Sequence, residues 1–178
     1  FCSSLEHISI PPSVKVIKSS AFSYCLSLNQ ISIPSSVTEI GSSAFYQCSS
    51  LTNISIPSSV SHIGEFAFNG CLSLKQVLFS IHSTLKIIER SVFQNCYALT
   101  EISLPSSLTE IGYEAFKNCS SLQHISIPSS IVRIGDFAFC DCSSLTEITI
   151  PASIEEIGSY AFKECYSLEK IFILSSAT

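Results

Sequence analysis

The sequence predicts a right-handed repeat solenoid of the α/β class, dominated by β-structure and built from about eight coils. Eight of the nine cysteines recur every 23 residues, apart from one interval of 25, and a Leu follows each after three residues. A 23-residue unit cannot bury its apolar side alone, whereas stacked units share a continuous core. The cysteines in this register are Cys2, Cys25, Cys48, Cys71, Cys96, Cys119, Cys142 and Cys165.

The first part of each unit predicts a short strand. Residues 30–33 read Gln-Ile-Ser-Ile, and this alternation of polar and apolar residues is typical of a strand with one buried face. Pro34 then ends the strand. Stacking these strands gives a parallel sheet, which we expect on the concave face of the solenoid.

The second part of each unit predicts the opposite, convex side. Residues 37–41, ending in Gly41, suit a second short extended piece. The spacing of Ala44, Phe45 and Cys48 places three apolar side chains on one side of a single helical turn. We therefore expect short extended or helical turns there, with the recurring Phe residues packed in the core rather than lining an aromatic pocket.

One unit, residues 71–95, is irregular because it has 25 residues. Ser80 replaces the Pro, Glu89 the Gly and Val92 the Ala of the other units, and the two extra residues fall within 80–84. Insertions in solenoids map to loops on one face, which is sometimes the binding face. The alternative is a tolerated irregularity. The whole chain, 1–178, is predicted to be one solenoid domain, either a processed protein or a piece of a longer one.

Composition excludes several classes of protein. The net charge of −5 argues against a nucleic-acid partner, which requires a basic surface. With 46% apolar and 13% charged residues, the chain is not a disordered tail. The apolar runs are far shorter than the ~18 residues of a membrane-spanning helix.

The pattern Leu28-x-x-Ile31-x-Ile33 followed by Ser36 resembles a leucine-rich repeat, and the unit from Leu28 to Cys48 is similar to the BspA-like, or Treponema-type, family. The resemblance implies a binding module of a bacterial or protist surface protein, with roles in adhesion, and neither an enzyme nor a cofactor. In many leucine-rich repeats an Asn after the strand bonds the backbone of the adjacent coil. We expect hydroxyls to do this here, rather than to act as nucleophiles; the matching residues are Ser13, Ser36, Ser59, Ser107, Ser130 and Ser153.

The cysteines are predicted to be buried thiols. Equivalent residues of stacked coils lie one strand spacing apart, whereas a disulfide needs Cβ atoms about 3.8 Å apart. A disulfide ladder is the alternative. Cys140 and Cys142 could also share a metal ion, but no second pair matches them.

The outward side chains of the predicted sheet are the candidate binding residues. His124 falls between Glu101 and Glu147, an arrangement that suits a small cation or a partner whose binding depends on pH; a solvated charge ladder is the alternative. A second column consists mainly of Ser and is interrupted by Leu78. The candidate residues are Gln30, Asn53, Gln76, Leu78, Glu101, His124 and Glu147.

We therefore expect an extracellular or cell-surface protein that presents this sheet to a host or extracellular-matrix protein or to a glycan. A structural protein that assembles end to end into filaments or layers is the alternative function, and the cytoplasm is the alternative location. Asn53 and Asn118 fit the glycosylation acceptor pattern, which also arises by chance in a Ser-rich chain.

Overall fold

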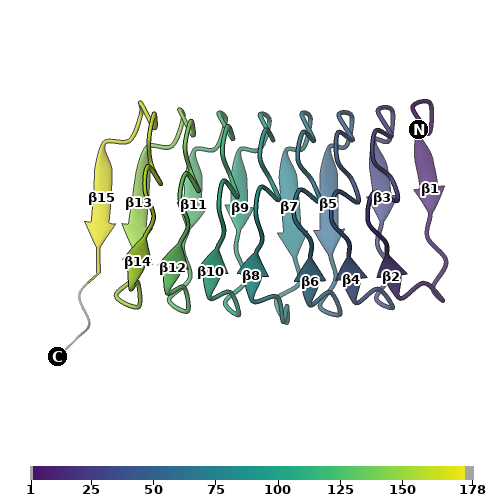
Figure 1. Ribbon diagram of the computed structural model, residues 1–178, viewed down its shortest axis with the longest axis horizontal. Helices are drawn as coiled ribbons and strands as arrows, with labels where there is room; N and C mark the ends of the chain where they lie inside the picture. The colour runs from purple at the N-terminus through teal and green to yellow at the C-terminus, as the bar shows by residue number, and fades with distance from the viewer. Residues whose placement is uncertain (1, 175–178) are drawn as a thin grey trace.

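The computed structural model describes residues 2–174 and shows a β-solenoid made of two kinds of strand. Figure 1 shows long strands on one side of each coil and two-residue strands on the other. The long strands are β1 (His7–Ser9), β3 (Gln30–Ser32), β5 (Asn53–Ile56), β7 (Gln76–Phe79), β9 (Glu101–Ser103), β11 (His124–Ser126), β13 (Glu147–Ile150) and β15 (Lys170–Ile173). The short strands are β2 (Val16–Ile17), β4 (Glu39–Ile40), β6 (His62–Ile63), β8 (Ile87–Ile88), β10 (Glu110–Ile111), β12 (Arg133–Ile134) and β14 (Glu156–Ile157).

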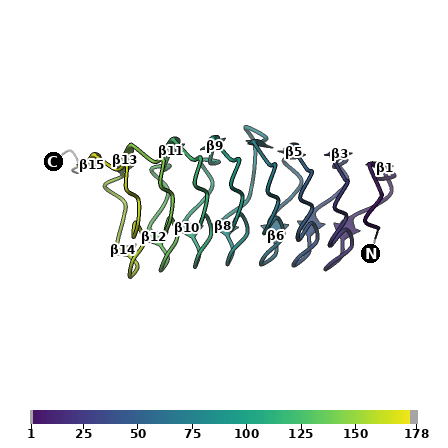
Figure 2. The same cartoon turned by 90° about the horizontal axis from the view of Figure 1, so that it is seen from above.

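All paired strands are parallel, and equivalent residues of successive coils face each other. Ile54 pairs with Val77, for example, and Ile17 pairs with Ile40. The long strands form a sheet of two (β1–β3) and a sheet of six (β5 to β15), and the short strands form sheets of three (β2–β4–β6) and four (β8 to β14). Figure 2 shows the coils side by side in an elongated body with one sheet row along each long side. The predicted parallel solenoid is confirmed.

The number of coils is smaller than predicted. A coil is complete when its long strand is followed by a short strand, and residues 2–174 contain seven short strands. The eighth cysteine-marked unit contributes only its long strand, β15, within these residues. The expectation of eight coils was therefore wrong, because counting cysteines counts the start of each coil rather than its closure.

The helical turns were also wrongly predicted, since no helix occurs in residues 2–174. Ser43 and Gln47 adopt left-handed backbone conformations, with φ of 56° and 59°, and such residues interrupt a helix. The N–H of Ser43 donates to Glu65 O and that of Gln47 to Asn69 O, both in the next coil. At this corner, alternate N–H groups donate to the next coil, whereas in a helix they would donate within the same coil.

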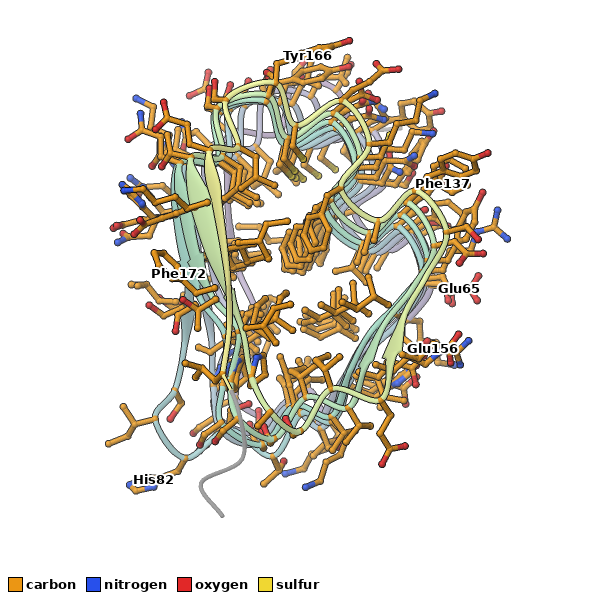
Figure 3. All side chains as sticks on the ribbon, turned by 90° about the vertical axis from the view of Figure 1, so that its left-hand side faces the viewer. Glu65, His82, Phe137, Glu156, Tyr166 and Phe172 are labelled. Carbon is orange, nitrogen blue, oxygen red and sulfur yellow. The ribbon has the colours of Figure 1, made fainter. Side chains whose placement is uncertain are left out.

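The interior consists of columns of identical or similar apolar side chains. Phe45, Phe68 and the equivalent rings stack nearly parallel in the middle of the molecule, with centroids 5.2 Å apart for this pair (Figure 3). Six cysteine thiols beside this column, from Cys48 to Cys165, donate to a Phe carbonyl of the preceding coil, as Cys71 Sγ does to Phe45 O at 3.3 Å. The core therefore satisfies its thiols while packing them as apolar groups.

The predicted serine bonds are present in four coils. The hydroxyls donate to a backbone carbonyl of the preceding coil at 2.6–2.7 Å in Ser36, Ser59, Ser107 and Ser153. Ser130 departs from the pattern, because its buried Oγ has no partner in the described part of the chain. No coil precedes that of Ser13 within residues 2–174, so the bond predicted for it has no acceptor there.

The irregular unit keeps its interior and changes its edge. Ser80 N–H donates to Ile56 O, a bond that the Pro of the regular coils cannot make, and Leu85 is buried in the column occupied by Val, Leu or Ile in other coils. The two extra residues therefore lie between Ser80 and Leu85, as predicted. The short-strand sheet is interrupted at the same place, since β6 and β8 belong to different sheets.

Candidate functional site

The outward side chains of the long strands form one broad surface, here called the long-strand face. The pleat of each strand sends Ile, Val or Leu into the core and the intervening residues outward. The register sets candidate residues side by side: Asn53 opposite Gln76, and Glu101 between Gln76 and His124. All seven candidates lie on this face, six of them exposed and Gln76 half-buried.

His124 lies between two carboxylate-bearing strands, as predicted. It pairs with Glu101, and the register of Ser126 with Thr149 places Glu147 on its other side. A shallow hollow of about 160 Å³ lies between His124 and Glu147. Among residues 2–174, however, no ion pair within 4.0 Å joins His124 to a carboxylate. The geometry is that of a row of solvated polar side chains.

A second depression lies on the long-strand face beside Leu78. Its volume is about 300 Å³, and Ser55 and Pro57 lie in it next to the larger Leu78 and Phe79. The outward column holds Ser in the neighbouring coils, so Leu78, 49% exposed, stands above a flat hydroxyl-lined surface. The result is an apolar wall with a recess beside it.

The inserted loop adds another exposed apolar residue to the same coil. Ile81 is 89% exposed, the highest value among the large exposed apolar residues of the described chain. His82 lies next to it at the edge of the coil, where Figure 3 shows it pointing away from the core. We call Leu78, Phe79 and Ile81 the anchor patch.

Charge is distributed unevenly along the solenoid. Residues 40–88 contain two lysines, Lys75 and Lys86, and a single carboxylate, Glu65. Glu65 lies on the side opposite the long-strand face (Figure 3). Residues 89–178 carry eleven carboxylates against five lysines and arginines, so the net negative charge resides there. The anchor patch therefore lies in the part of the chain that is poorest in carboxylates.

The cysteines form no metal site and no disulfide in the described residues, where all nine are free thiols. Cys142 belongs to the interior column, whereas Cys140 Sγ donates to Asp141 Oδ2 at 3.3 Å. Burial raises the pKa of Cys48 to about 12 and that of Cys140 to about 11. Thiols with such pKa values stay protonated at neutral pH and are poor nucleophiles and metal ligands.

An aromatic ridge on the side opposite the long-strand face was not predicted from the sequence. The Arg90 guanidinium lies over the rings of Phe66 and Tyr113, and Tyr113 meets Phe137 edge to face at 6.0 Å. Phe137 stacks on Tyr160 at 5.1 Å. A signal was present, because Phe66, Phe137 and Tyr160 each directly precede the Ala of the repeat. These contacts link successive coils, so the ridge is explained by packing between coils.

The sequence matches the family described as BspA type leucine rich repeat region, in six copies that cover residues 1–84 and 78–178. A leucine-rich repeat protein from Bacteroides ovatus is similar in structure, with a TM-score of 0.81 and 31% identity over 98% of this chain and 50% of that chain. The Treponema pallidum leucine-rich repeat protein has a TM-score of 0.77 and 34% identity, over 82% of this chain and 70% of that chain. A leucine-rich repeat protein from Eubacterium ventriosum has a TM-score of 0.82 and 31% identity, over 96% of this chain and 44% of that chain.

This chain therefore spans half of the Bacteroides ovatus protein and somewhat less of the Eubacterium ventriosum protein. No curated protein matches the sequence. Within residues 2–174, no helix is long and apolar enough to cross a membrane.

Proposed function

Because the chain belongs to the BspA-type leucine-rich repeat family, we propose that it is the protein-binding module of a secreted or surface-displayed adhesion protein. The observation that carries the proposal is the long-strand face itself. Its outward columns are polar and mostly exposed over successive coils, and they are covered by no other part of residues 2–174. Solenoids use such extended surfaces for contacts with other proteins.

The chemistry of the face favours binding over catalysis. The small hydroxyl residues Ser103, Ser126 and Thr149 leave the strands accessible, so a partner can approach the sheet closely. Its hollows are shallow, and the candidate acid and base groups are spread along strands instead of converging on one point. A typical stable protein contact buries about 800 Å² on each partner, which a face of several strands can supply.

The test is adhesion of the purified chain to surfaces coated with solubilised extracellular matrix or with a panel of glycans. The variant Ser103→Arg with Ser126→Arg places two long charged side chains on the face. The matched control is Ser61→Arg, because Ser61 is exposed next to the short strand β6.

We expect the matrix surface to retain the unmodified chain and the control and to lose the face variant. Retention on glycans alone would assign the face to carbohydrate. Equal retention of all three proteins would overturn binding through the long-strand face. Light scattering that grows with concentration, as filaments form, would favour the structural alternative.

A further inference from the structure

We propose that the irregular coil is the anchor point of the long-strand face, where an extended segment of an acidic protein partner inserts an apolar side chain beside Leu78. This inference rests on the proposed function and names the chemistry of the partner. The recess next to Leu78 takes the apolar side chain, and carboxylates on the same partner segment lie toward His82 and Lys86.

Three changes that distinguish the irregular coil meet at this one place. Leu78 replaces the Ser of the outward column, Phe79 replaces the Ile that follows it in most coils, and the insertion adds Ile81. Packing inside the solenoid does not require Leu78 or Ile81, because both side chains are exposed, whereas Phe79 lies at an inward position and packs partly against the core. Exposed apolar groups next to a recess are typical of the few residues that dominate a protein contact.

The recess has the form expected for a side-chain pocket. Ser55 and Pro57 line its floor, and Leu78 and Phe79 form one wall. Ile33, from the coil that precedes that of Ser55, lies at the other side. At about 300 Å³, it has room for one Leu or Ile side chain, and it is a shallow depression rather than an enclosed cavity. The partner must therefore bring the apolar group on a chain that lies along the face.

Charge selects an acidic segment. The loop from β7 to β8 carries His82 and Lys86 and no carboxylate, and Lys75 immediately precedes β7. The nearest carboxylate on the face is that of Glu101, which pairs with Gln76 at the other end of β7. An acidic partner segment therefore meets no like charge at the loop, whereas it would be repelled by the carboxylate-rich later coils.

The probes are three fluorescein-labelled ten-residue peptides measured by fluorescence polarisation. One has a central Leu flanked by Glu, the second has the same Leu flanked by Lys, and the third replaces the Leu of the first by Ser. We expect the first to bind at least tenfold more tightly than either of the others, and its binding to weaken as salt is raised. Equal binding of all three, or no binding up to about 1 mM, overturns the proposal.

The variants Leu78→Ser and Ile81→Ser locate the contact. Each is expected to weaken binding of the first peptide at least tenfold, and neither touches the core, since both side chains point outward. Ser126→Leu is the matched control, because it places a Leu in the same column of a regular coil without the recess and loop. Unchanged binding in both anchor variants, or a second site created by Ser126→Leu, contradicts the proposal.

The matrix assay separates the anchor proposal from the proposed function. If the Ser103→Arg, Ser126→Arg variant is no longer retained on the matrix while Leu78→Ser is retained as before, the proposed function is upheld and the anchor is rejected.

Discussion

The regular coil of residues 119–141 and the irregular coil of residues 71–95 are alike inside and different outside. Cys119 donates to Phe93 O, a residue 26 positions earlier in the sequence. Cys96 makes the same bond to Phe68 O, although the insertion increases this separation to 28 residues. The ring stack also continues, with Phe68 and Phe93 at 5.6 Å. The comparison teaches that the interior columns set the register, while the edge loop absorbs the insertion and is free to acquire a function.

Alkaline pH should weaken both kinds of coil and gives the largest expected effect, because it acts on every interior thiol at once. Burial raises the pKa of Cys48 from 9.0 to about 12, so this thiol adds stability below pH 9 that is lost as the pH rises toward 12. Burial also raises the pKa of Cys96 and Cys119, which begin the two coils that follow the irregular one. Urea unfolding followed between pH 8 and 11 should show the midpoint falling. Apart from the exposed thiol of Cys2, thiolate absorbance in the ultraviolet should appear only as the chain unfolds. A larger signal in the folded chain would contradict burial of the column.

Truncation of one ring tests whether the two coils are equally packed. Phe93→Ala and Phe139→Ala should each destabilise the chain by about 3–5 kcal/mol, because both rings are fully buried between two other rings. Chemical denaturation measures both. A much smaller loss for Phe93 would mean that the irregular coil is loosely packed inside as well as outside.

The repeat position that is Gly in most coils should respond differently in the two regions. A Cβ on Gly135 would lie 2.8 Å from Gly112 C and from Tyr113 N, which are backbone atoms, so Gly135→Ala should cost about 1–3 kcal/mol. Glu89 occupies the same position beside the interruption between β6 and β8. Glu89→Gly should therefore gain nothing from relief of crowding and lose at most about 1 kcal/mol through backbone entropy. A gain in thermal stability for Glu89→Gly would show that the interruption gives Glu89 no extra room.

The smallest expected effect concerns the serine hydroxyls. Ser107 Oγ donates to Leu85 O of the irregular coil at 2.7 Å, so Ser107→Ala should cost about 0.5–1.5 kcal/mol. Ser130→Ala in the regular part should change stability little, because its buried Oγ has no partner in the described chain. The urea unfolding midpoints of the two variants measure both losses. A larger loss for Ser130→Ala than for Ser107→Ala would show that the hydroxyl of Ser130 is the one bonded in solution.

Much of the fold follows from the spacing of the sequence. The interval of 23 residues and the alternation after each Leu predict the strand register, and the loss of Pro at Ser80 places the insertion. The corners could not be predicted in this way. The Ala44, Phe45 and Cys48 spacing fits a helical turn equally well, and only the pairing of corner N–H groups with the next coil removes that possibility.

The candidate site was predicted in outline only. Alternation identifies which side chains point outward, so Leu78 and His124 could be assigned to the face from the sequence. The recess beside Leu78 depends on the relative heights of side chains from three coils, and the exposure of Ile81 depends on the path of an inserted loop. Neither has a sequence period from which it could be inferred.

A crystal structure with sulfur anomalous scattering would test most directly whether one interior register runs through both kinds of coil. The anomalous peaks of Cys48, Cys71, Cys96, Cys119 and Cys142 are expected in a single row, with neighbours separated by about 4.8 Å and Cys140 off the row. A break in the row between Cys71 and Cys96, or sulfur atoms paired at bonding distance, would contradict the account.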